Sequence, residues 1–169
     1  MDIFLQQIIN GLVLGSVYAL VALGYTMVYG IIGLINFAHG EVLMVGALTS
    51  WSVIGMMQEA MPGSPGWLTL LISLIIACVV AATLNFVIEK LAYKPLRNSP
   101  RLAPLITAIG MSLLLQTLAM IIWKPNYKPF PFLLPTVPYE IGGAVITLTQ
   151  IIILATTVLT LAVLMWLVN

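Results

Sequence analysis

An amide, the chain's single histidine and a carboxylate stand within six residues in the stretch GLINFAHGEVLMVG, as Asn36, His39 and Glu41. Side chains of these types exchange hydrogen bonds with polar ligands, so this cluster is the best candidate site in the sequence. A metal site is not expected, because no second histidine or cysteine stands near His39. A Ser–His–acid triad is not excluded by counting residues, but nothing places a nucleophile beside His39. The motifs GxxxxGK[ST], HExxH and CxxC are absent, and we do not expect the chain to hydrolyse ATP by itself.

The spacing of the cluster does not suit an unbroken helix. Asn36 and His39 would share one face, whereas Glu41 would lie about 140° round from Asn36 and tend to face lipid. Gly40 offers a place to break the helix, and a second helix starting there would carry Glu41 in its first turn, where the helix dipole favours a carboxylate. Broken helices at membrane depth line cavities and mark substrate pathways. The alternative is a cluster at the cytoplasmic interface, with Asn36 as a helix cap and Glu41 as a solvated charge.

The composition of the chain indicates a membrane around this cluster. Of the 169 residues, 62 % are apolar and 7 % are charged, whereas a soluble domain carries about 25 % charged residues. We therefore expect an integral membrane protein in contact with lipid. The net charge of +1 gives no indication of a nucleic-acid partner. The single cysteine, Cys78, lies in an apolar run and allows no internal disulfide.

Five apolar segments are long enough to cross the hydrocarbon core, which takes about 20 helical residues. We expect an all-α fold with about five transmembrane helices in a single polytopic domain, residues 1–169, with the second helix broken near Gly40. The predicted spans are 4–28, 31–57, 67–88, 102–123 and 144–168. A turn rich in proline and glycine separates the second and third spans, and the proline-rich segment 124–143 is expected to be an extended external loop.

Basic residues give the orientation. Four of the six lie in the loop between the third and fourth spans, which should therefore be cytoplasmic: Lys90, Lys94, Arg97 and Arg101. The proline-rich loop is then outside, as is the N-terminus if the second segment crosses once, and the C-terminus lies at the cytoplasmic face. If the segment of the cluster re-enters instead, the N-terminus changes side.

Small and polar residues on the spans predict helix packing. Gly11, Gly15 and Ala19 recur at a spacing of four, which lets helices approach closely. Glu89 beside Lys90 is expected to form an interfacial charge pair. Lone amides within or near spans are expected to form hydrogen bonds between helices, with pathway lining as the alternative: Asn85, Gln116 and Gln150.

Three motifs in the same order give a resemblance to a known family. The segments GYTMVYGIIGLINFAHGEVLMVGA, IEKLAYKPLR and LITAIGMSLLLQ closely resemble landmarks of branched-chain amino acid ABC transporter permeases of the LivH type. The resemblance covers residues 5–116 well and is weaker beyond them. It implies a multi-pass permease of the bacterial or archaeal cytoplasmic (inner) membrane that forms a translocation path for leucine, isoleucine or valine. Asn36, His39, Gly40 and Glu41 match a segment near the centre of such permeases, which favours the broken helix and a substrate pathway.

The resemblance also implies partners. They are a second permease of the LivM type, two cytoplasmic ATPase subunits that hold the ATP, and a periplasmic substrate-binding protein, so we expect no cofactor on this chain and no enzymatic activity. Family permeases are longer, and the loop that docks into the ATPase follows the fifth span. The chain therefore resembles the N-terminal half of a permease. The alternatives are a truncated membrane remnant without transport, a permease for urea or short amides, and a secondary transporter with Glu41 as its proton site.

Overall fold

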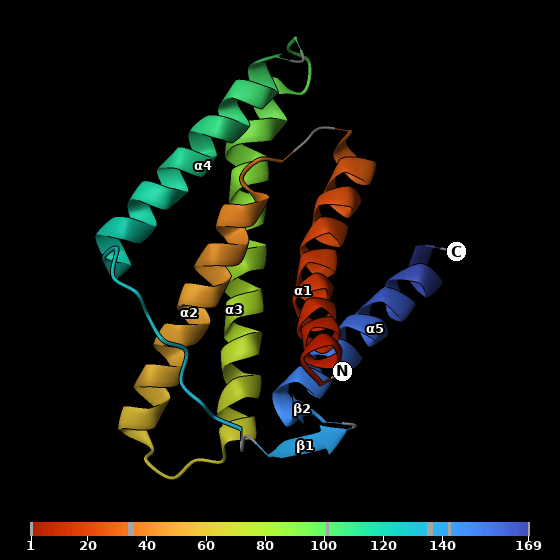
Figure 1. Cartoon of the computed structure of the whole chain (residues 1–169). Coiled ribbons are helices and arrows are strands. Elements are labelled where there is room, and N and C mark those ends of the chain that lie inside the picture. Colours follow the sequence, from red (N-terminus) through yellow and green to blue (C-terminus); the bar gives the residue numbers. More distant parts are fainter. Residues whose placement is uncertain (1, 34–35, 101, 135–136, 142, 169) are drawn as a thin grey trace. The chain divides into compact units, whose positions relative to one another are not determined.

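Five helices dominate the structure, a computed structural model that describes residues 2–33, 36–100, 102–134, 137–141 and 143–168 (Figure 1). Within these residues all five are long and apolar enough to cross a membrane. The predicted all-α membrane fold is confirmed, with one short β-hairpin added to it. The elements are α1 (Asp2–Ile32), α2 (His39–Ala60), α3 (Gly66–Ile88), α4 (Leu102–Trp123), β1 (Pro138–Ile141), β2 (Ala144–Thr147) and α5 (Leu148–Val168).

The chain forms two compact units, one from residues 1–27 and 134–169 and one from residues 28–133. In the second unit α2 lies along α3 and also contacts α4. Its buried core joins the start of α2 to the end of α3 and the middle of α4 through Ala38, Val42, Ile88 and Leu115. Small residues allow α2 and α3 to approach closely, since a Cβ at Gly46 would lie 3.9 Å from that of Ala81.

A π-helical turn, Glu89–Tyr93, and a 3-10 turn, Lys94–Leu96, extend α3 before the chain reverses into α4. This connection contains the basic motif. In it Glu89 pairs with Arg97, at 3.7 Å between Oε1 and Nη2, rather than with Lys90. The ammonium of Lys90 instead lies 5.8 Å from the centroid of the Phe86 ring. The predicted pairing of Glu89 with Lys90 is therefore wrong, because the turns bring Arg97 back over the end of α3.

The extended segment of residues 124–133, here called the strap, follows α4. Lys124 ends that helix with a positive φ of 60°. The strap is held along α2 by the Trp51 indole, whose Nε1 donates to the Pro129 carbonyl at 3.1 Å. It then reaches the start of α3, where Leu133 lies directly against Gly66. The predicted extended conformation is correct for this part of the proline-rich segment.

The β-hairpin occupies the rest of that segment and lies in the first unit. Strands β1 and β2 pair antiparallel, from Pro138 opposite Thr147 to Ile141 opposite Ala144. The fifth helix therefore begins at Leu148, not at residue 144 as predicted, because Ala144–Thr147 are paired with β1. The side-chain amide of Gln6 on α1 makes two hydrogen bonds to the backbone of Val145, at 2.8 and 3.1 Å. Thr147 and Gln150 form a capping box at the start of α5.

Candidate functional site

The break between α1 and α2 forms the centre of the candidate site. Helix α1 continues to Ile32 and ends at Gly33, which has a φ of +69° and donates its N–H to the Tyr29 carbonyl at 2.8 Å. This is the left-handed helix end that glycine favours. Helix α2 starts at His39, so the break precedes Gly40, which is the second residue of α2. A break close to Gly40 was predicted correctly, but the second helix starts at residue 39 and not at 31.

Asn36 organises the chain just before α2. Its Oδ1 accepts hydrogen bonds from the Ala38 N–H at 3.0 Å and from the Tyr93 hydroxyl at 2.7 Å. Its backbone carbonyl accepts the N–H of His39 at 3.1 Å. The first of these bonds is an Asx turn, which directs the backbone into the following helix. Asn36 is buried and is not the N-cap, a position that Ala38 occupies. The helix-cap role in the interfacial alternative is therefore wrong.

Glu41 lies in the first turn of α2, as predicted, and reaches α4. Its Oε1 accepts hydrogen bonds from the Ser112 hydroxyl at 2.9 Å and from Nε2 of Gln116 at 2.7 Å. The expected interhelical bond of Gln116 is thus confirmed. Ser112 was not singled out in the sequence, although its spacing of four from Gln116 places both on one face of a helix.

The start of α2 is partly buried beside α3 and α4. Ser112 is the eleventh residue of α4, so about 15 Å of α4 continues past the level of Glu41. Figure 1 shows the connection between α3 and α4 extending beyond the start of α2. Ala38, at the break itself, has no exposed surface. A helix start that lies about 15 Å short of the start of α4 fits the broken-helix prediction.

The polar residues of the predicted cluster contact two different parts of the second unit. Asn36 faces the π-helical turn through Tyr93, and Glu41 faces α4. His39 and Gly40 are half-buried in the first turn of α2 between these contacts. Tyr93 was also not singled out in the sequence, because its contact with Asn36 joins residues 57 positions apart.

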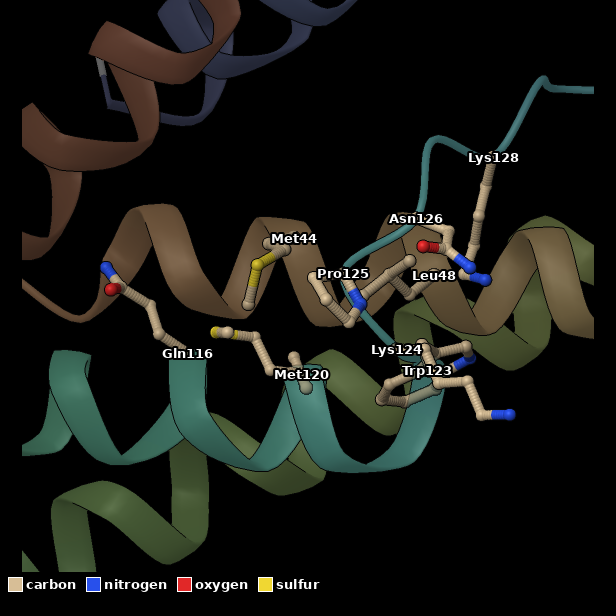
Figure 2. Close-up of a pocket in the computed structure, with 10 residues that line it drawn as sticks. Met44, Leu48, Gln116, Met120, Trp123, Lys124, Pro125, Asn126 and Lys128 are labelled. Atoms are coloured by element: carbon tan, nitrogen blue, oxygen red, sulfur yellow. The ribbon is translucent and has the colours of Figure 1, made fainter.

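A groove between α2 and α4 begins at Gln116, the hydrogen-bond partner of Glu41, and was not predicted from the sequence. Its volume is about 480 Å³. Figure 2 shows Met44 and Met120 pointing toward each other across it, with Gln116 at one end and the lysines of the strap at the other. Gln116 connects the groove to Glu41 through its hydrogen bond. The lining residues are Met44, Leu48, Gln116, Ala119, Met120, Trp123, Lys124, Pro125, Asn126 and Lys128.

The remaining predicted site residues lie elsewhere. Lys90, Lys94 and Arg97 are in the turns after α3, whereas Arg101 is outside the described residues. Gly11, Gly15 and Ala19 are exposed on α1. Within the described chain a Cβ at Gly11 or Gly15 would meet no atom within 4 Å, so close packing at this stripe stays a prediction.

Comparisons with known proteins identify the family. The family model described as the permease component of branched-chain amino acid transport systems matches residues 7–169. The high-affinity branched-chain amino acid transport system permease protein BraD of Pseudomonas aeruginosa is 45 % identical over 161 residues, which cover 92 % of this chain and 52 % of BraD. LivH proteins of the same description from Escherichia coli K12 and Salmonella typhimurium are 54 % and 53 % identical over 113 residues, covering 67 % of this chain and 36 % of each relative. No solved structure matches.

The chain spans about half the length of the curated relatives it matches, or less. The match nevertheless includes α1 from residue 7, the other four apolar helices and the whole candidate site. Together with these helices, the relatives indicate a multi-pass protein of the cytoplasmic membrane. The chain belongs to the family of permease components of branched-chain amino acid transport systems.

Proposed function

We propose that this chain forms part of the translocation path of an ABC importer for the branched-chain amino acids leucine, isoleucine and valine. The observation that carries the proposal is the family match over residues 7–169. The names of BraD and LivH, which describe permease proteins of high-affinity branched-chain amino acid transport systems, support the same substrates. In this function the chain supplies a path through the membrane and catalyses no covalent step.

The energy for transport would come from other subunits. We propose a second permease of the LivM type beside this chain, two cytoplasmic ATPase subunits that bind and hydrolyse ATP, and a periplasmic protein that delivers the amino acid. This chain would then hold no cofactor. Membership in a family of permease components supports the need for further transport components.

The break between α1 and α2 is the proposed substrate pathway, lined by Asn36, His39, Gly40 and Glu41. Glu41 gives the strongest support. It lies on α2, an apolar helix that can cross a membrane, and its side chain reaches α4. Among the described residues the ion pair is that of Arg97 with Glu89, and Glu41 has no basic partner. A carboxylate on a membrane-spanning helix is costly, which makes a role in transport the default explanation.

Uptake of radiolabelled leucine tests this proposal. The chain is expressed with its cognate transport components in bacteria that lack their own branched-chain uptake, and Asn36→Ala and Glu41→Ala are compared at equal membrane levels. Losing one hydrogen bond to a charged group costs about 1.5–3 kcal/mol, so the uptake of Glu41→Ala should fall about tenfold or more. The control is Glu59→Ala, because Glu59 is exposed near the other end of α2.

Two results would contradict parts of the proposal. Unchanged uptake in both variants would remove Asn36 and Glu41 from the pathway. Uptake of urea or acetamide without uptake of leucine by the unsubstituted complex would contradict the assignment to amino acids.

A further inference from the structure

We propose that the groove between α2 and α4 is a subsite for one amino acid, in which the second carboxylate oxygen of Glu41 receives the α-ammonium group and the groove wall receives the aliphatic side chain. The inference rests on the proposed function for the identity of the substrate. It adds the location of the amino acid and the group that binds its positive charge.

The hydrogen bonds of Glu41 leave one oxygen for a ligand. Ser112 and Gln116 both donate to Oε1, at 2.9 and 2.7 Å, and Oε2 takes part in neither bond. The two donors are neutral, so they fix the carboxylate without neutralising its charge. A cation beside a carboxylate on a membrane-spanning helix compensates part of the cost of removing that carboxylate from water. The α-ammonium group of an amino acid supplies that cation, with N–H donors for Oε2.

The wall of the groove fits an aliphatic side chain. On α2, Glu41, Met44 and Leu48 follow one another at positions i, i+3 and i+7, so they lie along one face of the helix. Met120 faces them from α4, four residues after Gln116 (Figure 2). Methionine side chains are flexible and adapt to branched groups of different shape. The volume of about 480 Å³ lies in the range of small-molecule pockets, about 300–1,000 Å³.

The length of the groove separates this subsite from the lysines of the strap. Lys124 follows Gln116 by eight residues, which is about 12 Å along a helix. The ammonium and carboxylate groups of an α-amino acid are only one carbon atom apart, so we place both at the Gln116 end of the groove. Lys128 already lies over the Trp51 ring, with Nζ 4.8 Å from its centroid. The lysines are thus at the mouth of the groove, and the second N–H of the Gln116 amide is the donor for the carboxylate of the bound amino acid.

The test measures protection of a cysteine in the groove. Cys78 is first replaced by serine, and Met44→Cys is introduced into the assembled transporter in membrane vesicles with ATP and the binding protein. Leucine should slow alkylation of this cysteine by N-ethylmaleimide severalfold. 4-Methylpentanoate, which has the side chain of leucine but no ammonium group, should give no protection. Glu41→Gln, which keeps the shape of residue 41 but removes its charge, should abolish the protection by leucine.

Two matched variants serve as controls. Leu118→Cys is exposed on α4 and lies about 200° from Gln116 and Met120, so leucine should not change its alkylation. Glu59→Gln makes the same substitution near the far end of α2 and should leave the protection at Met44→Cys intact.

The outcomes separate the subsite from the function. Equal protection by leucine and 4-methylpentanoate, or full protection in Glu41→Gln, would overturn the ammonium site. Absence of protection at Met44→Cys while the unsubstituted complex imports leucine would overturn the subsite and leave the proposed function standing. A cysteine that is blocked before leucine is added would mean that a lipid chain or partner helix fills the groove, which also overturns the subsite. Failure of the unsubstituted complex to import any branched-chain amino acid would contradict the proposed function itself.

Discussion

The Tyr93 hydroxyl ties the π-helical turn to the break before α2. It donates at 2.7 Å to Oδ1 of the buried Asn36, the same oxygen that forms the Asx turn. We expect Tyr93→Phe to lower the free energy of unfolding by about 1 kcal/mol, the usual net value of one hydrogen bond. Asn36→Ala should lower it further, because both bonds to Oδ1 are lost. Thermal unfolding of the purified complex in detergent measures the difference.

Tyr127→Phe is the matched control for this prediction. Tyr127 lies in the strap and is 92 % exposed, so removing its hydroxyl should leave the unfolding temperature unchanged. Equal losses at the two tyrosines, or no loss at Tyr93, would contradict the role given to the Tyr93–Asn36 bond.

At the level of single residues the sequence identified some members of each polar contact and missed others. Asn36, Glu41 and Gln116 were recognisable because polar side chains are rare in an apolar span. Tyr93 and Ser112 were not, because Tyr93 is 57 positions from Asn36 and Ser112 is 71 from Glu41. Contacts over such distances depend on how α2, α3 and α4 pack, which periodicity along the chain does not contain. The groove was missed for the same reason, since its two walls come from different helices.

The strap contacts α3 at a glycine, so a larger residue there should disturb both elements. Gly66 is the first residue of α3, and a Cβ there would overlap the carbonyl group of Leu133. Because this neighbour is backbone, it cannot move aside by changing a rotamer. We expect Gly66→Ala to displace the strap and to destabilise the protein by about 1–3 kcal/mol, as overpacking does. Thermal unfolding in detergent measures the loss.

Gly55→Ala is the control with the opposite expected sign. Gly55 lies inside α2, and a Cβ there would meet no atom within 4 Å in the described chain. Alanine is the better helix former by about 0.5–1 kcal/mol, so this variant should be as stable as the original or more stable. If both alanine variants behave alike, the contact between Gly66 and Leu133 does not position the strap.

At the level of elements the spans were predictable and their ends were less so. Apolar length located five helices, but it did not show that Gly33, not Gly40, would adopt the positive φ that ends α1. Gly40 instead lies inside α2, next to Ala38 and Val42, which belong to the buried core. The residues of β2 were assigned to the fifth span, because a short apolar run can be helix or strand until its pairing partner is known.

Large apolar side chains are exposed on all five helices, so the helices present apolar surface to their surroundings. Extensive apolar surface of this kind is expected where helices face lipid or partner chains. In the first unit the stripe of Gly11, Gly15 and Ala19 is also exposed, and it remains the predicted place for close contact with another helix. These surfaces agree with the proposal that the chain works in a membrane together with further transport components.

The orientation of the second unit can be measured directly. Lys90, Lys94 and Arg97 lie at the end of this unit where α3 turns into α4, whereas the strap follows the opposite end of α4. Basic loops are retained in the cytoplasm, so the strap should face outward. In a Cys78→Ser background, Tyr127→Cys in the strap should react with a membrane-impermeant maleimide on intact cells. Asn98→Cys, exposed in the basic connection, should react only after permeabilisation. The reverse pattern would invert the unit and contradict the cytoplasmic location predicted for the basic connection.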